Sequence, residues 1–237
     1  MEKQILDKNQ WHSIRTNLNN NYDYSDDWKN IIDLFRTRIE NYYLSPINRV
    51  KVPGILKGEG FTIMTIQCAL IEMFATFKSG QIHNYRKNGN SPSFEYKLAD
   101  HCFIKFLQTE KIFENHFYRY TTAGVKILND PFKAKDFYSS VRCGLMHEAR
   151  TKGNWVINAK RLYNGNEHIF LTEDNGTIRV DRNILSRLLN EYLDNYLLEL
   201  SAETQIGNNL RRLFARKLDH LYDIVPDSNN YDWWQDY

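Results

Sequence analysis

The sequence is short of the features that identify whole classes of protein. Its three cysteines, Cys68, Cys102 and Cys143, are widely spaced and include no C-x2-C pair, which argues against a disulfide framework and against a zinc site. The formal net charge is only +2, so no overall basic field indicates a nucleic-acid partner. We therefore expect buried thiols in a reducing cytosol, and any RNA binding has to be local.

Long apolar runs are also missing. The most apolar stretch lies within residues 61–77, and it is interrupted by Thr62, Thr65, Gln67, Glu72 and Thr76. We expect a buried helix there and not a membrane span. The sequence shows no signal-peptide pattern, so we expect a cytoplasmic protein without a membrane partner.

Helical patterning and aromatic residues are plentiful. Aromatic residues make up 14% of the chain, which suits a folded core. Apolar residues recur every three or four positions, which predicts helices over residues 8–22, from residue 25 to just before Pro46, over 98–117, over 132–151, from 182 onward and over 208–222. Residues 61–78 are apolar on nearly every side, which predicts the central helix of a bundle.

The period changes between residues 154 and 181. Two Asn-Gly pairs, Asn164-Gly165 and Asn175-Gly176, stand between short β-prone runs. Asn-Gly between apolar runs favours a β-hairpin, so we predict a small antiparallel β-meander over residues 154–181. The expected fold class is mainly α, a helical bundle over residues 1–237 with this meander inserted. The acidic, aromatic tail 227–237 is expected to fold back onto the core, the alternative being a docking peptide.

Several other features have weaker functional readings. Residues 79–93 form a polar loop with Arg86 and Lys87 beside Tyr85, which is either solvated or an RNA-contacting flap. Gly58 and Gly60 resemble a phosphate loop only weakly, because the Gly-Lys-Ser/Thr ending is missing, so we expect no nucleotide binding there. Six histidines have no metal-ligand spacing and are expected to be surface or structural residues: His12, His83, His101, His116, His168 and His220.

Arg142 and His147 stand out within the helix predicted over residues 132–151, with four residues between them. Arginine is a permanent cation and histidine transfers protons near neutral pH. On a helix the two residues differ by about 140° in direction and about 7.5 Å in rise, so they flank one groove. A cation beside a proton-transfer group is suited to cleaving a phosphodiester.

The Arg142-x4-His147 spacing resembles the R-x4-6-H motif of the HEPN superfamily, small all-helical domains of which many are metal-independent ribonucleases of toxin–antitoxin and antiviral defence systems. The resemblance implies a HEPN-like bundle that acts as a homodimer and pools two Arg/His sets in one cleft. It also implies an RNA substrate, no metal or other cofactor, and 2′,3′-cyclic phosphate and 5′-hydroxyl products. An antitoxin or another defence-system protein is a further implied partner.

The residues around the motif are expected to support it. Tyr138 lies four residues before Arg142 and so on its helix face, while Glu148 and Arg150 follow His147. Any of the three can orient the pair or hold a phosphate.

Two further residues favour the alternative of a non-catalytic HEPN-like module that binds RNA or a protein partner. Cys143 occupies the place where many active HEPN members carry a polar residue. Glu72 needs a partner on its apolar helix, and an ion pair with Arg142 would satisfy it. The two interpretations differ in whether Arg142 and His147 reach one solvent-open cleft.

Overall fold

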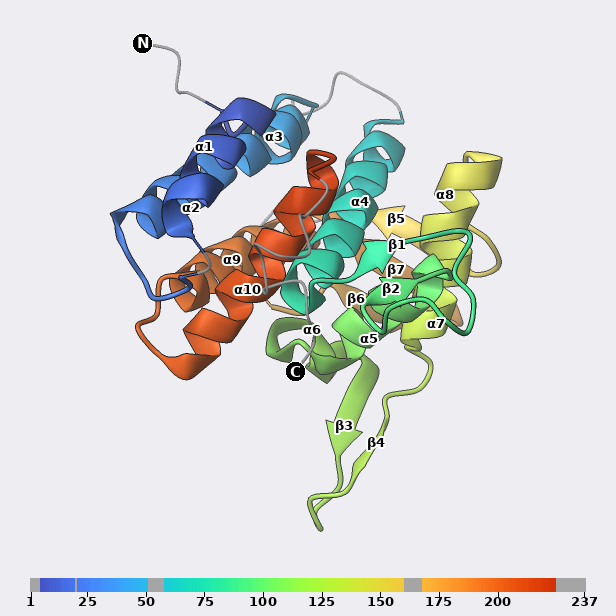
Figure 1. Ribbon diagram of the computed structural model, residues 1–237. Helices are drawn as coiled ribbons and strands as arrows, with labels where there is room; N and C mark the ends of the chain where they lie inside the picture. Colours follow the sequence, from blue (N-terminus) through green and yellow to red (C-terminus); the bar gives the residue numbers. More distant parts are fainter. Residues whose placement is uncertain (1–4, 20, 51–57, 160–167, 225–237) are drawn as a thin grey trace. The chain divides into compact units, whose positions relative to one another are not determined.

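The computed structural model describes residues 5–19, 21–50, 58–159 and 168–224, and this part of the chain is mainly helical, as the sequence predicts (Figure 1). The chain divides into two compact units: unit 1 takes residues 1–45, 73–99 and 193–237, and unit 2 takes residues 46–72 and 100–192. Two long helices, α4 (Glu59–Ser79) and α9 (Arg182–Leu200), contribute to both units. The expectation of a single domain over residues 1–237 stays a prediction.

Unit 1 contains α1 (Lys8–Leu18), α2 (Asp26–Ile39) and α10 (Gln205–Leu221), together with the second part of α4 and of α9. The first helix begins where the sequence indicates, because the Asp7 side chain accepts a hydrogen bond from the Gln10 N–H in a capping box. Phe35, Phe77 and Phe214 form the aromatic centre of the unit, with ring centroids 4.8–5.4 Å apart.

The helix that starts at residue 26 does not stop before Pro46, so that expectation was wrong. α2 passes into a π-helical turn, η1 (Glu40–Leu44), and then into α3 (Ser45–Val50). In the π-helical turn the Ser45 N–H donates to the Glu40 carbonyl oxygen, five residues back. Pro46 then occupies the first turn of α3, a position that tolerates a residue without an N–H.

Unit 2 contains α5 (Ala99–Thr109) and α6 (Lys111–Phe117), where the sequence predicts one helix. The predicted helix over residues 132–151 is a continuous run of α7 (Ala134–Phe137), a π-helical turn η2 (Tyr138–Arg142) and α8 (Cys143–Glu148). Phe137 and Val141 are fully buried and Leu145 is 8% exposed, so the predicted core-facing stripe is confirmed. Phe103 and Phe117 pack against Phe137 in the core of this unit.

A three-stranded sheet in unit 2 corrects the predicted antiparallel meander. Its strands are β5 (Trp155–Asn158), β6 (Leu171–Asp174) and β7 (Thr177–Asp181), in the order β5-β7-β6. β6 and β7 form the expected hairpin, and its turn residues Asn175 and Gly176 have φ values of +50° and +77°. β5 pairs with β7 and runs parallel to it, whereas β6 runs antiparallel to β7. Asn164-Gly165 and the tail 227–237 lie outside the described residues.

Two short strand pairs were not expected from the sequence. In unit 1, β1 (Ile82–His83) and β2 (Glu95–Tyr96) bracket most of the polar loop 79–93. In unit 2, β3 (Tyr118–Tyr120) and β4 (Lys126–Leu128) form an antiparallel hairpin that projects from α6 (Figure 1). Its residues are mostly exposed, so the alternation that identifies a half-buried strand is weak here.

α4 is long and apolar enough to cross a membrane by length and composition, but 56% of its most apolar window is buried inside the protein. Such burial is typical of a core helix. The helix is not buried on every side, since Phe61 is 42% exposed. The expectation of a core helix is therefore confirmed, although Phe61 and Thr62 in its first turn, Ala69 in its middle and Ser79 at its end are exposed.

Candidate functional site

Arg142 is positioned by the π-helical turn η2, of which it is the last residue. In this turn the Cys143 N–H donates to the Tyr138 carbonyl oxygen, five residues back. Single π-helical turns inside α-helices occur frequently at functional sites. Sequence periodicity did not indicate the turn, because the buried stripe of this helix is kept through it.

Arg142 forms the ion pair with Glu72 that the sequence suggested. Arg142 Nη2 lies 2.8 Å from Glu72 Oε2, and the two side chains are 18% and 26% exposed. The Arg142 guanidinium also lies 5.5 Å from the centroid of the Tyr138 ring. Burial alone would lower the pKa of Arg142, but the hydrogen bond and charge of Glu72 outweigh it and raise that pKa. The guanidinium is therefore fixed in position and fully charged.

The Tyr138 side chain contacts both Arg142 and the buried Phe103. Its ring packs edge-on against Phe103, with ring centroids 5.2 Å apart. Burial raises the pKa of the Tyr138 phenol to about 12, and a hydrogen bond with Cys143 acts in the same direction. Burial also raises the pKa of the Cys68 thiol to about 12. Tyr138 and Cys68 are thus neutral at physiological pH, and the Tyr138 ring can orient the Arg142 guanidinium without carrying a charge of its own.

His147 lies in the last turn of α8 and is exposed. Within residues 5–19, 21–50, 58–159 and 168–224 it has no hydrogen bond or ion pair, so the ring can reach a bound molecule. Arg142 has helical dihedral angles and directly precedes α8, which carries His147, so the two residues diverge by about 140° over about 7.5 Å along the helix. In one chain the Arg142 and His147 side chains therefore lie along the same helical run but do not converge on a single point.

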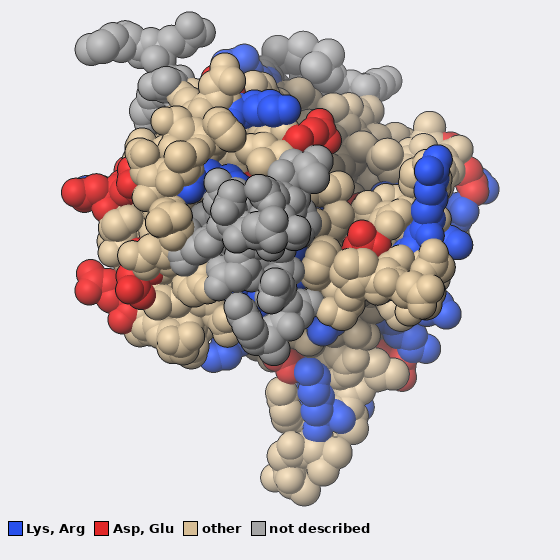
Figure 2. All heavy atoms as spheres, viewed as in Figure 1, with Lys and Arg blue, Asp and Glu red and all other residues tan. Residues whose placement is uncertain are grey.

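Glu148 and Arg150 lie beside His147 and contact each other. Arg150 Nε is 3.4 Å from Glu148 Oε2, and Lys152 Nζ is 2.6 Å from Glu148 Oε1. Hydrogen bonding from Lys152 lowers the pKa of Glu148. Figure 2 shows Lys and Arg side chains gathered over the α8 end of unit 2. Because Arg150 is 70% exposed and Lys152 is 40% exposed, both can reach an anionic partner.

Gly144 is a further residue of this site that the sequence did not single out. Beyond Ala149, which has a φ of +53°, the chain folds back over α8. A Cβ on Gly144 would lie 2.5 Å from the Arg150 carbonyl oxygen, and the Lys152 N–H donates to the Ser140 carbonyl oxygen over 2.9 Å. Glycine is needed for this close approach. The turn holds Arg150 and Lys152 next to the motif.

His116, one of the six histidines outside the motif, is structural, as expected. Its Nδ1 lies 3.2 Å from the Phe113 carbonyl oxygen and its Nε2 lies 2.9 Å from the His168 carbonyl oxygen. In the part of the chain that the structure describes, no three His, Cys, Asp or Glu side chains come close enough to hold a metal ion.

No protein-family model, no curated protein and no solved structure matches this chain. The arrangement of Arg142, Glu72, Tyr138 and His147 is therefore the basis for a functional proposal.

Proposed function

We propose that this protein is a metal-independent endoribonuclease of a bacterial defence or toxin–antitoxin system, in which Arg142 and His147 act on the RNA backbone. The observation that carries the proposal is the contrast between the two side chains. Arg142 is held by Glu72 and Tyr138, whereas His147 is exposed and free of partners in the described chain. A fixed cation and an accessible proton-transfer group are the two functions that RNA cleavage requires.

In the proposed reaction His147 removes the proton from a ribose 2′-hydroxyl, and the 2′-oxygen attacks the adjacent phosphorus. Arg142 stabilises the extra negative charge on the phosphorane. The bond from phosphorus to the 5′-oxygen then breaks, the leaving oxygen takes a proton from water, and the His147 imidazolium releases its proton to solvent. The products are a 2′,3′-cyclic phosphate and a 5′-hydroxyl. Tyr138 and Glu72 act on Arg142 and do not touch the substrate.

A homodimer is part of this proposal, because Arg142 and His147 diverge along the helix. In a symmetric dimer, Arg142 of one subunit can meet His147 of the other across the two-fold axis. Arg150 and Lys152 would hold flanking phosphates locally, which suits a chain whose net charge is only +2. We propose a cytoplasmic location and an antitoxin or defence-system protein as a further partner.

A second function is favoured by the same ion pair. Glu72 occupies one edge of the Arg142 guanidinium, so Arg142 can also be a structural residue. The chain would then be a non-catalytic module that binds RNA or a protein partner through the α8 surface. Cys143, in place of a polar residue after the arginine, agrees with this alternative.

The test is cleavage of single-stranded RNA in the presence of EDTA, with the 5′ and 3′ ends of the products identified. We expect His147→Ala and Arg142→Ala each to reduce cleavage by at least about a hundredfold. Matched controls are His101→Ala, which removes another exposed histidine, and Arg179→Ala, which removes another half-buried arginine paired with a carboxylate. Both controls should cleave at the wild-type rate.

Three results would contradict the ribonuclease. These are loss of cleavage in EDTA, unchanged cleavage by His147→Ala, or products with a 3′-hydroxyl. RNA binding without cleavage by the wild-type chain would support the non-catalytic module.

A further inference from the structure

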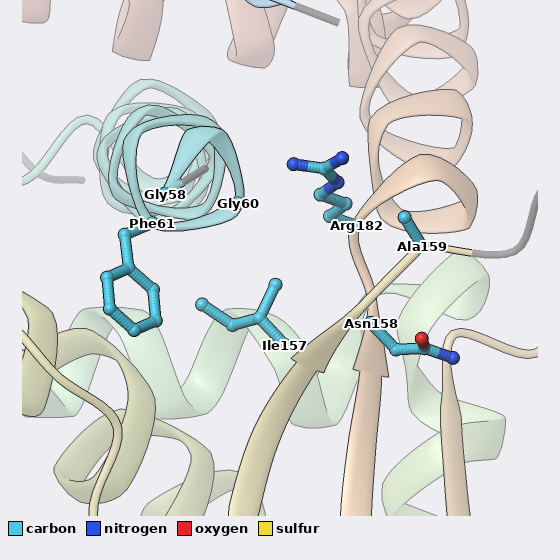
Figure 3. A pocket seen from close by; sticks show the side chains of 7 residues that line it. All are labelled: Gly58, Gly60, Phe61, Ile157, Asn158, Ala159 and Arg182. Carbon is cyan, nitrogen blue, oxygen red and sulfur yellow. The ribbon is translucent and has the colours of Figure 1, made fainter. Parts of the chain in front are cut away.

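A cavity of about 440 Å³ opens in unit 2, where α4 and α9 begin and β5 ends (Figure 3). Ligand pockets in proteins usually measure roughly 300–1,000 Å³. The backbone of Gly58 and Gly60 forms part of its lining, and Phe61, Ile157 and Arg182 contribute side chains. None of these residues belongs to the Arg142 and His147 site, so the cavity is a separate candidate binding site.

Arg182 supplies the charged group of the cavity. The residue is 8% exposed, and its Nη2 is ion-paired with Glu59. Its Nε and the Glu59 Oε2 atom are buried and have no hydrogen-bond partner in the described chain. Nη1 is the guanidinium nitrogen beside Gly60, and Glu59 balances the charge of Arg182, so the cavity offers the Nη1 donor without a net positive charge. This favours a neutral acceptor, such as a carbonyl oxygen, over a phosphate or carboxylate.

Gly60 keeps the cavity open beside the guanidinium. A Cβ at this position would lie 3.3 Å from Ile157 Cγ2 and 3.4 Å from Arg182 Nη1. In Figure 3 the Arg182 guanidinium extends toward the first turn of α4, and Ile157 lies between Phe61 and Arg182. The space therefore has apolar groups on one side and a hydrogen-bond donor on the other. Phe61, 42% exposed, offers an aromatic face at its edge.

We propose that this cavity binds a nucleobase, with guanine preferred. A flat ring can lie against Phe61 and Ile157 while its edge accepts hydrogen bonds from Arg182. Guanine presents two acceptors, O6 and N7, on one edge, whereas adenine replaces O6 with an amino donor that would face the donors of Arg182. The base comes from single-stranded RNA or from a free guanine nucleotide. The proposal goes beyond RNA cleavage, because binding here needs neither Arg142 nor His147.

The test is calorimetric titration of the full chain with guanosine 5′-monophosphate and with adenosine 5′-monophosphate. We expect the guanine nucleotide to bind at least about tenfold more tightly. Phe61→Ala should weaken its binding at least about fivefold by removing the stacking face. Gly60→Ala should weaken it by a similar factor, because the added methyl group occupies the space beside Arg182. Tyr120→Ala, which removes another exposed aromatic ring (56%), should bind as the wild type does.

A second arm identifies the source of the base. It compares a 2′-O-methyl oligoadenylate that contains one guanine with an all-adenine strand of the same length. Tighter binding of the guanine-containing strand than of the mononucleotide indicates RNA, and the reverse order indicates a free nucleotide. Because 2′-O-methyl strands cannot be cleaved through the 2′-oxygen, binding is read separately from ribonuclease activity. Equal binding of both bases in both arms, no binding in either arm, or guanine binding unchanged by both Phe61→Ala and Gly60→Ala, would overturn the proposal.

Discussion

The ion pair between Arg142 and Glu72 is only partly withdrawn from water, with side chains 18% and 26% exposed. Breaking a fully buried pair from one end costs about 3–5 kcal/mol, but here the charge left behind can still be hydrated. We expect Arg142→Ala and Glu72→Gln each to lower the free energy of unfolding by about 1–2 kcal/mol. The double variant should lose little more than either single variant, because both remove the same interaction.

Urea or thermal unfolding of the three variants measures this coupling, with Arg179→Ala as the reference for an arginine in a more exposed pair. Strictly additive losses would show that the pair contributes nothing. A loss of several kcal/mol shared by Arg142 and Glu72 would favour the non-catalytic module over the ribonuclease, because it would make the pair mainly architectural.

His116 provides a pH-dependent contribution to stability. Burial lowers its pKa from the ordinary value of 6.5, although hydrogen bonds to the Phe113 and His168 carbonyl oxygens oppose the shift. The unfolded chain therefore takes up a proton at a higher pH than the folded protein does. The stability associated with a neutral His116 is complete above pH 6.5 and is lost as the pH falls below 6.5 toward the folded-state pKa.

We expect His116→Gln to unfold more easily at neutral pH but to lose less stability than the wild type on acidification. The measurement is the free energy of unfolding at several values between about pH 7 and about pH 5. His101→Gln, at an exposed histidine, serves as the control and should keep the wild-type slope. An unchanged slope in His116→Gln would show that the ring is not the group that titrates.

At the scale of elements, Gly144 fixes the turn that ends the motif helix. The Arg150 carbonyl oxygen would lie 2.5 Å from a Cβ at this position, and the obstructing atom belongs to the backbone. We expect Gly144→Ala to lower the free energy of unfolding by about 1–3 kcal/mol, because the turn from Ala149 to Lys152 must move. Lys135→Ala, at an exposed position of α7 in the same helical run, should change stability by less than about 0.5 kcal/mol.

RNA cleavage by Gly144→Ala, measured at a temperature where it is folded, separates two roles of the turn. If Arg150 and Lys152 hold the substrate, KM for RNA should rise more than kcat falls. A stable Gly144→Ala variant with wild-type kinetics would show that the close approach has no influence on the site.

The elements that the sequence predicted correctly are those with a strong apolar period. The start of α1, the extent of α4 and the hairpin between β6 and β7 follow from the spacing of apolar residues, from overall hydrophobicity and from an Asn-Gly turn, respectively. The π-helical turn η2 was missed because the buried residues Phe137, Val141 and Leu145 keep a four-residue spacing through it. The turn η1 was missed because an α-helical period was assumed, although the buried residues Ile39 and Leu44 stand five positions apart. The parallel partner of β5 was missed because local residues do not determine which strand lies next to which.

At the scale of the whole molecule, the candidate site was predictable only where a motif or an isolated charge pointed to it. Arg142 and His147 are recognisable by spacing, and Glu72 by its place on an apolar helix. The cavity near Arg182 had no comparable signal, because Glu59 and Arg182 are 123 residues apart in the sequence and meet only in the fold. Sites built from helix ends of distant segments depend on tertiary packing that residue patterns do not specify.

The oligomeric state also belongs to the scale of the whole molecule. Because Arg142 and His147 of one chain diverge, the proposed ribonuclease site requires two subunits. We expect the protein to elute as a dimer at micromolar concentration, with α8 near the two-fold axis. Met146 is an exposed apolar residue directly before His147, so a dimer of this kind would bring two copies of Met146 together. Met146→Glu should therefore place like charges opposite each other, shift the protein toward monomer and reduce RNA cleavage.

Light scattering after size-exclusion chromatography measures the molecular mass of the protein. Mixing two variants that carry opposite charges at position 146 tests the interface directly. Met146→Glu and Met146→Lys should each be monomeric alone but should form a heterodimer and regain cleavage when combined, because opposite charges then face each other across the axis. Leu198→Glu, which adds the same charge at a 72% exposed apolar position of α9, should remain dimeric and active. A monomeric wild type, or mixed variants that regain neither mass nor activity, would remove the composite site. Either result would favour the non-catalytic module over the ribonuclease as the function of the surface that carries Arg142 and His147.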